Sequence, residues 1–215
     1  MSRIFITGSV DGLGRAAAAE LMDEGHDVVL HARSRQRAAS LADLAGRAAG
    51  VVIGDLSSAA ETRAVADQVN DIGRMDAVIH NAAVFLVPSR AATADGHART
   101  VAVNTLAPYV LTALIGRPDR LVYLSSGMHL GGTSSLRDID WTQRRWSPSQ
   151  AYSDSKLHVT ALALTIARVW PRSAATPSTR AGFRPGWAAP EPPTTWRWGT
   201  SPRPGSPSAT TPPRL

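Results

Sequence analysis

The chain has 215 residues, of which 43% are apolar and 19% are charged, so it is long enough for one α/β domain and too short for two of ordinary size. It contains no cysteine, which excludes disulfide bonds and thiolate metal sites. No apolar run approaches the roughly 18 residues of a membrane span, and the N-terminus lacks the pattern of a secretory signal. The cytoplasm is therefore the expected location.

The net charge of +6 comes almost entirely from the end of the chain. Residues 171–215 contain six arginines and one acid, and ten of the 15 prolines lie beyond position 171. We therefore expect a folded domain at residues 1–170 and a Pro- and Arg-rich tail at 171–215 that is disordered. The arginines could bind nucleic-acid phosphates weakly, but no recognition helix or nucleic-acid motif accompanies them, so no nucleic-acid partner is predicted.

The domain alternates short apolar runs with segments of helical period. Strands are predicted at residues 3–7, 27–32, 51–53, 77–80 and 120–124. Helices are predicted at residues 13–24, 36–44, 58–69, 96–115 and 148–170, with Ser57 or Ser58 as a cap. Such alternation indicates right-handed βαβ units and a parallel sheet that is covered on both faces.

Polar residues follow several of these strands. They are Thr7-Gly8, Asp55, Asn81 and Ser126. Because ligands bind beyond the carboxyl ends of parallel strands, these residues predict a site at one edge of the sheet.

The first strand leads into a glycine-rich loop at residues 7–14, in which the glycines have the spacing G-x-x-x-G-x-G. Glycine permits a tight turn and lets backbone N–H groups approach a pyrophosphate at the positive end of a helix. A turn that serves only chain reversal is the alternative, but the position between a strand and a helix favours nucleotide binding.

In this order the motifs resemble those of the short-chain dehydrogenase/reductase family. They are T-G-x-x-x-G-x-G at residues 7–14, Asp55-Leu56, Asn81-Ala82-Ala83, Asn104 in the long helix, Ser126, and Tyr152-Ser153-Asp154-Ser155-Lys156. The resemblance covers residues 3–170 and is closest to the retinol-dehydrogenase-like branch. It implies a Rossmann-type, doubly wound parallel sheet in three α/β/α layers. Ala83 departs from the family, which usually has glycine there.

The resemblance also implies the catalytic residues, which are Ser126, Tyr152, Lys156 and Asn104. Tyr152 and Lys156 are four residues apart and share one helix face. A free phenol has a pKa of about 10, and a neighbouring ammonium favours its ionised form. The resemblance implies that Tyr152 is the general acid/base. Lys156, the only lysine in the chain, would lower that pKa and hold the nicotinamide ribose. Ser126 would orient the substrate oxygen, and Asn104 would hold a water.

The cofactor contacts follow from the same resemblance. They are expected at Thr7, Gly8, Ser9, Gly12, Leu13, Gly14, Arg33, Asp55, Leu56, Asn81, Ala82, Ala83, Tyr152 and Lys156. The second strand ends in His-Ala-Arg-Ser-Arg at residues 31–35, without the acid that would accept a ribose 2′-hydroxyl. Arg33 can instead pair a 2′-phosphate, which favours NADP(H) over NAD(H). No metal is predicted, because His80, His129 and His158 lack ligand spacing.

We therefore expect an oxidoreductase that transfers a hydride between NADP(H) and a small-molecule carbonyl or alcohol. A truncated nucleotide-binding protein without turnover is the alternative. The sequence does not identify the substrate, and it does not distinguish a homodimer from a homotetramer.

The tail does not match the family, which continues with a sixth strand, a Pro-Gly turn, a helix and a seventh strand. We expect these C-terminal strands to be missing. Codons can be chosen for residues 175–190 so that the same bases, read two positions later, encode Asn-Ala-Val-Asp-Pro-Gly-Trp-Val-Pro-Thr-Arg-Met-Gly-Gly-Pro, which contains the strand and the Pro-Gly turn of the family. The sequence thus suggests a frameshift between about Arg168 and Ala175, in the gene or in its sequencing.

Overall fold

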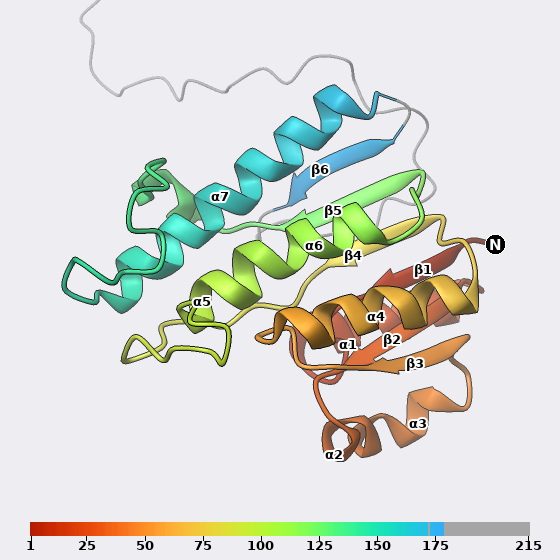
Figure 1. Ribbon diagram of the computed structural model, residues 1–215. Helices are drawn as coiled ribbons and strands as arrows, with labels where there is room; N and C mark the ends of the chain where they lie inside the picture. Colours follow the sequence, from red (N-terminus) through yellow and green to blue (C-terminus); the bar gives the residue numbers. More distant parts are fainter. Residues whose placement is uncertain (172, 179–215) are drawn as a thin grey trace, which may run out of the picture. The chain divides into compact units, whose positions relative to one another are not determined.

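A computed structural model describes residues 1–171 and 173–178 of the chain. These residues form a parallel sheet with the strand order β3-β2-β1-β4-β5-β6 (Figure 1). The strands are β1 (Arg3–Ile6), β2 (Asp27–Ala32), β3 (Gly50–Ile53), β4 (Ala77–His80), β5 (Arg120–Leu124) and β6 (Ala174–Ser178). The chain proceeds outward from β1 to β3, returns to β4 beside β1, and continues outward again. This is the predicted doubly wound order.

Helices cover both faces of the sheet. They are α1 (Gly12–Asp23), α2 (Arg35–Ala38), α3 (Ala42–Ala45), α4 (Ala59–Ile72), α5 (Arg99–Val101), α6 (Ala107–Leu114) and α7 (Pro148–Val169). Figure 1 shows α4, α6 and α7 side by side across one face, with α1 behind the strands. Short turns of other helical type lie at Ala39–Leu41, Ala102–Leu106 and Gly127–Gly131.

Local sequence explains where the long helices begin. The hydroxyl of Ser58 accepts a hydrogen bond from the backbone N–H of Glu61 and caps α4, and Ser147 caps α7 in the same way through Gln150. Pro148 occupies the first position of α7, where its missing N–H costs nothing. Of the two serines predicted to cap α4, Ser58 is the one used.

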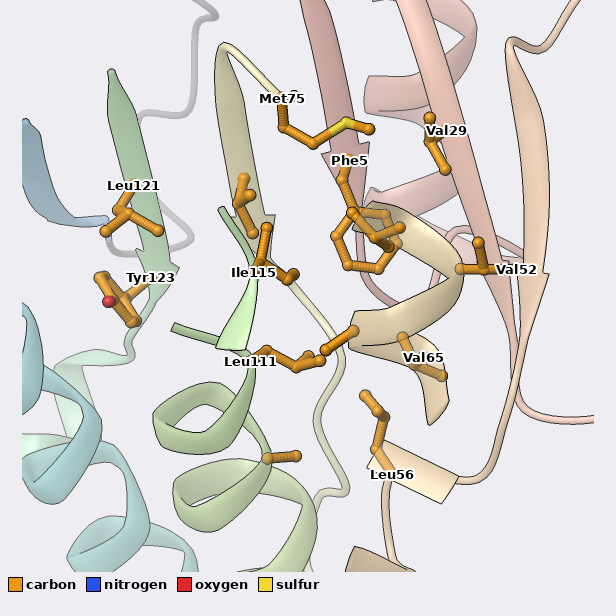
Figure 2. Packing of buried hydrophobic residues seen from close by; sticks show 14 of the residues in the cluster. Phe5, Val29, Val52, Leu56, Val65, Met75, Leu111, Ile115, Leu121 and Tyr123 are labelled. Atoms are coloured by element: carbon orange, nitrogen blue, oxygen red, sulfur yellow. The ribbon is translucent and has the colours of Figure 1, made fainter. Parts of the chain in front are cut away.

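The strands of the sheet centre are buried on both faces. Phe5 and Val29 face the layer of α4 and α6, and Figure 2 shows Phe5 close to Met75 and Val29 in this core. The alternating residues Ile4 and Val28 are also fully buried, on the opposite face. Doubly covered strands carry unbroken apolar runs, which is why these runs predicted a parallel sheet.

Two predicted helices are less regular than expected. The segment predicted as a helix over 36–44 contains α2, a 3₁₀ turn and α3. The helix predicted over 96–115 begins only at Arg99 and contains a π-helical stretch, Ala102–Leu106, which carries Asn104. The wider π turn accompanies two hydrogen bonds between the Asn104 side chain and the backbone of Val84, a contact that periodicity does not reveal.

The sequence predicts coil from residue 171, but the structure has a strand there, β6. Ala174–Ser178 pairs in parallel with β5, and the backbone N–H of Ser125 donates to the carbonyl of Ser178 over 2.7 Å. Main-chain pairing needs little from the side chains, and Pro177 is tolerated because β6 is the last strand of the described sheet. The folded domain thus continues past the predicted boundary at residue 170. The rest of the predicted tail, 179–215, lies outside the described residues.

Within the described part of the chain, no helix combines the length and the apolar character that crossing a membrane requires.

A buried polar cluster lies between β4, β5 and α6. The Thr112 hydroxyl donates to the carbonyl of Pro108 over 2.7 Å, so it accepts from the hydroxyl of Tyr123 at 2.8 Å and from Nε2 of His80 at 3.1 Å. The rings of His80 and Tyr123 stack 4.7 Å apart. Burial lowers the pKa of His80 to about 3 and raises the pKa of Tyr123 to about 12.

His80 should make stability depend on pH. Between its folded pKa of about 3 and its ordinary value of 6.5, the unfolded chain binds a proton at His80 that the folded chain does not bind. The free energy of unfolding should therefore fall as pH decreases through this window, by about 1.4 kcal/mol per pH unit for one proton. His80→Phe, which keeps a ring against Tyr123, should remove that one-proton slope in urea denaturation at pH 5, 6 and 7. Equal slopes in the two proteins would contradict this.

Candidate active site

A cavity of about 690 Å³ lies at the carboxyl ends of the strands, where the sequence predicts a site. The predicted site residues that line it are Gly8, Gly12, Leu13, Arg33, Asp55, Leu56, Asn81, Ala82, Ala83, Ser126, Tyr152 and Lys156. The other predicted residues, Thr7, Ser9, Gly14 and Asn104, are buried behind this lining. The strand order reverses between β1 and β4, and the cavity opens beside that reversal.

The glycine-rich loop packs tightly onto the end of β4. The hydroxyl of Thr7 accepts hydrogen bonds from the backbone N–H groups of Asn81 and Ala82, each over 3.0 Å. The Asn81 amide donates back to the carbonyls of Thr7 and Gly8. A Cβ at Gly14 would lie 2.4 Å from both the Asn81 amide nitrogen and the Gly8 oxygen, so only glycine fits there. Thr7 and Asn81 therefore fix the shape of the loop.

The N-terminus of α1 faces this cavity. Asp11 occupies the cap position without a side-chain cap hydrogen bond, and its carboxylate forms an ion pair with Arg37 instead. Gly12 and Leu13 in the first turn line the cavity. A helix N-terminus carries partial positive charge and N–H donors, which suits a phosphate group.

The end of β2 brings further basic side chains to the cavity. Arg33 is exposed and lines the cavity. His31 and Arg37 also line the cavity, and neither was predicted from the sequence. His31 is the last residue but one of β2, and Arg33 directly follows the strand. This closeness to Arg33 in the sequence is a signal that could have revealed His31. No acidic residue occupies positions 31–35.

Asn104 contacts the loop that follows β4. Its side-chain oxygen accepts from the N–H of Val84 over 2.8 Å, and its amide donates to the carbonyl of Val84 at 3.0 Å and to the hydroxyl of Ser155 at 3.1 Å. Asn104 is 2% exposed, whereas Val84 lines the cavity. The side chain therefore positions the cavity wall from behind.

Tyr152 and Lys156 lie one turn apart on α7 and both line the cavity. The Lys156 Nζ atom is 5.6 Å from the centre of the Tyr152 ring and donates a 2.6 Å hydrogen bond to the carbonyl of Leu124. The lysine is 4% exposed, and burial lowers its pKa to about 8. A compact cation is thus held beside the phenol in a poorly solvated position.

The two serines after β5 have different surroundings. The Ser125 hydroxyl lies 2.6 Å from that of Thr160, so it is engaged with α7. The Ser126 hydroxyl accepts from the N–H of Met128 over 3.3 Å and lines the same cavity as Tyr152. Both serines line the cavity, and Ser126 is the less buried of the two.

Further residues of the cavity wall carried no sequence signal. The ring of Phe85 meets that of Tyr152 edge to face, with the ring centres 4.8 Å apart, although Phe85 is 62% exposed. Arg99 also lines the cavity, and its Nε atom is buried without a hydrogen-bond partner among the described residues. Both belong to the segment between β4 and the π-helical stretch, whose path is set by tertiary contacts.

Known proteins are similar to this chain in sequence. A model of the short chain dehydrogenase family matches residues 2–173. An uncharacterized oxidoreductase of Emericella nidulans is 46% identical over 190 residues, which cover 87% of this chain and 70% of the relative. Retinol dehydrogenase 13 of Mus musculus is 30% identical over 168 residues, 73% of this chain and 50% of that protein. Relatives of the retinol-dehydrogenase kind, which the sequence predicts, are thus among the matches. The matched part of this chain spans only half the length of retinol dehydrogenase 13.

Solved structures have the same arrangement. A crystal structure of a protein from Mycobacterium paratuberculosis superimposes with a TM-score of 0.74 at 32% identity, covering 83% of this chain and 68% of that one. A short-chain dehydrogenase from Sphingobium yanoikuyae, in complex with NADPH, has a TM-score of 0.63 at 22% identity, covering 83% of this chain and 70% of that one.

The depressed pKa of Lys156 can be measured directly because the chain has no other lysine. An amine reacts with acetic anhydride only when deprotonated, so the labelling rate of Lys156 should reach half its maximum near pH 8, not near the ordinary value of 10.5. Trace labelling followed by peptide mapping separates Lys156 from the amino group of Met1. A midpoint near pH 10.5 would mean that the ammonium is well solvated.

Proposed function

Since the chain belongs to the short-chain dehydrogenase family, we propose that it is an oxidoreductase that transfers a hydride between NADP(H) and a carbonyl or alcohol substrate. The observation that carries the proposal is a single cavity lined by the glycine-rich loop, Arg33, Ser126, Tyr152 and Lys156. The cavity thus combines groups suited to an anionic cofactor with a candidate acid/base.

The residues present fit the cofactor. The close approach of Gly14 to Gly8 leaves no room for a side chain, and the α1 N-terminus offers its first turn to the cavity without a side-chain cap. These features suit a pyrophosphate group. Asp55 and Leu56 line the same cavity and would contact the adenine. When bound, the nicotinamide group supplies or accepts the hydride.

The remaining chemistry belongs to side chains of this protein. Tyr152 would donate a proton to the carbonyl oxygen during reduction and take it back during oxidation, and Ser126 would hydrogen-bond the same oxygen. Lys156, held beside the ring by the carbonyl of Leu124, would stabilise the phenolate and hold the ribose hydroxyls. Asn104 would act from behind by fixing Val84.

Arg33 is the basis for proposing NADP(H) as the preferred cofactor. Arg33 lines the cavity. Among the described residues, its guanidinium has no hydrogen-bond or ion-pair partner that would compete with a phosphate. Arg37 lies nearby but is paired with Asp11. A guanidinium can bind a phosphate through two parallel hydrogen bonds, whereas a ribose 2′-hydroxyl has no charge for it to neutralise.

The second candidate is a protein that binds the nucleotide without turnover. It is favoured by the composition of residues 171–215, for which we propose a change of reading frame between about Arg168 and Ala175. Resequencing the DNA, or an intact mass from the native source, distinguishes a frame change in the gene from one in the sequencing.

Tyr152→Phe should test the acid/base role, and turnover by the unmutated chain should separate the two candidates. Removing the hydroxyl should lower kcat by at least about 100-fold, because proton transfer is lost, while the Kd for NADPH changes by less than about threefold. Lys156→Arg should also lose activity, since a guanidinium fork is bulkier than an ammonium. Turnover is followed by NADPH absorbance with a panel of aldehydes and ketones.

Tyr109→Phe is the matched control, because Tyr109 is 59% exposed on α6 and is absent from the cavity lining. Substantial kcat in Tyr152→Phe would remove this residue from the acid/base role. NADPH binding by the unmutated chain without turnover of any carbonyl would favour the second candidate.

Arg33→Asp should change cofactor choice. The unmutated protein should bind NADPH more tightly than NADH, and the substitution should weaken NADPH binding by about tenfold or more while affecting NADH little. Fluorescence titration measures both constants. Arg35→Asp makes the same charge change at an exposed residue outside the cavity lining and should leave the preference in place. Equal affinities for the two cofactors in the unmutated protein would contradict the assignment.

A further inference from the structure

The buried imidazole of His31 forms two hydrogen bonds of opposite polarity. Its Nδ1 atom accepts from the backbone N–H of Gly8 over 2.9 Å, and its Nε2 atom lies 2.9 Å from the carbonyl oxygen of Gly54. A backbone N–H can only donate and a carbonyl can only accept. The two partners therefore require the neutral tautomer with its proton on Nε2.

These bonds connect three strand ends. His31 lies near the end of β2, Gly8 follows β1, and Gly54 follows β3. The main chain adds to the connection, since the His31 N–H donates to the hydroxyl of Ser9 over 2.7 Å and the Ser9 N–H donates to the His31 carbonyl over 3.2 Å. The first turn of the glycine-rich loop is thus attached to β2 as well as to β4.

Gly8 has little freedom to move without disturbing its surroundings. It has a φ of +65°, and a Cβ built on it would lie 3.0 Å from the Cα of Ala82. Its carbonyl accepts from the Asn81 amide, and its N–H is held by His31. A shift of Gly8 would therefore move the loop relative to α1, whose first turn lines the cavity.

We propose that His31 is a positioning residue for the cofactor: through Nδ1 it fixes the Gly8 amide and with it the phosphate-binding turn of the glycine-rich loop. The proposal rests on the proposed function, because the ligand whose site His31 shapes is NADP(H). His31 lies near the end of β2, Arg33 directly follows that end, and both line the cavity. One strand end then sets the pyrophosphate site through His31 and the 2′-phosphate site through Arg33.

The electrostatic surroundings of His31 agree with this role. Desolvation by burial lowers the pKa of His31, against opposing effects of the Gly54 carbonyl and the Asp55 carboxylate. The other charged groups of the shared cavity near this strand end are Arg33 and the ion pair of Arg37 with Asp11. The imidazole is therefore neutral at neutral pH and keeps Nδ1 as an acceptor for Gly8.

Two amide variants separate the two hydrogen bonds. The side-chain oxygen of asparagine is as many bonds from Cα as Nδ1 of histidine, and the amide nitrogen of glutamine corresponds in the same way to Nε2. His31→Asn should retain the acceptor for Gly8, whereas His31→Gln should retain only the contact with Gly54. Circular dichroism and thermal melting establish that both variants are folded.

The first measurement needs no cofactor. Exchange of the Gly8 amide proton with solvent, followed by NMR on the ligand-free full chain, should be about tenfold faster in His31→Gln than in the unmutated protein and close to unmutated in His31→Asn. Equal exchange in the two variants would overturn the proposed contact. This result stands even if the unmutated protein binds no NADPH, an outcome that would refute the proposed function instead.

The second measurement compares the binding of NADPH with the binding of its fragment adenosine 2′-phosphate. His31→Gln should raise the Kd for NADPH by about tenfold, with less than about a threefold change in His31→Asn. The Kd for adenosine 2′-phosphate, which has no pyrophosphate, should stay unchanged in both variants. Parallel losses for NADPH and adenosine 2′-phosphate would show a general loss of structure and would overturn the positioning role.

Discussion

The packing of β1 against β4 is the constraint on which the rest of the site depends. At this point the strand order reverses, so the connections leave the sheet in opposite directions and a cavity opens between them. Hydrogen bonds between Thr7 and Asn81 join the two strand ends, and Gly14 fits only because it has no side chain. A change at this junction would move the glycine-rich loop and the wall of the cavity together.

Burial of polar groups recurs throughout the site, and three of the buried side chains have defined partners. Lys156 donates to the carbonyl of Leu124, Asn104 is bonded to Val84, and His31 lies between Gly8 and Gly54. Unpaired buried polar groups are costly, so such contacts hold side chains and loops in one arrangement. A preformed site of this kind loses little entropy when it binds a ligand.

The sequence predicted the sheet, its doubly wound order and the edge at which the cavity lies, because apolar strands and strand-end motifs are local signals. It did not predict the π-helical stretch at Asn104, which depends on a contact with Val84 that is 20 residues away. It also missed His31 and Phe85, whose roles arise from neighbours on other elements. For β6 the composition was misleading, since Ala174–Ser178 is held by main-chain pairing with β5.

The proposed function requires that a hydride pass from NADP(H) to a carbonyl compound in this cavity. The most direct test is to incubate the full 215-residue chain with NADPH deuterated at C4 of the nicotinamide and a panel of ketones and aldehydes, and to determine by mass spectrometry whether an alcohol product carries the label. We expect deuterium at the carbinol carbon of at least one product and none with Tyr152→Phe. Saturable NADPH binding with no label transferred to any carbonyl would contradict the account.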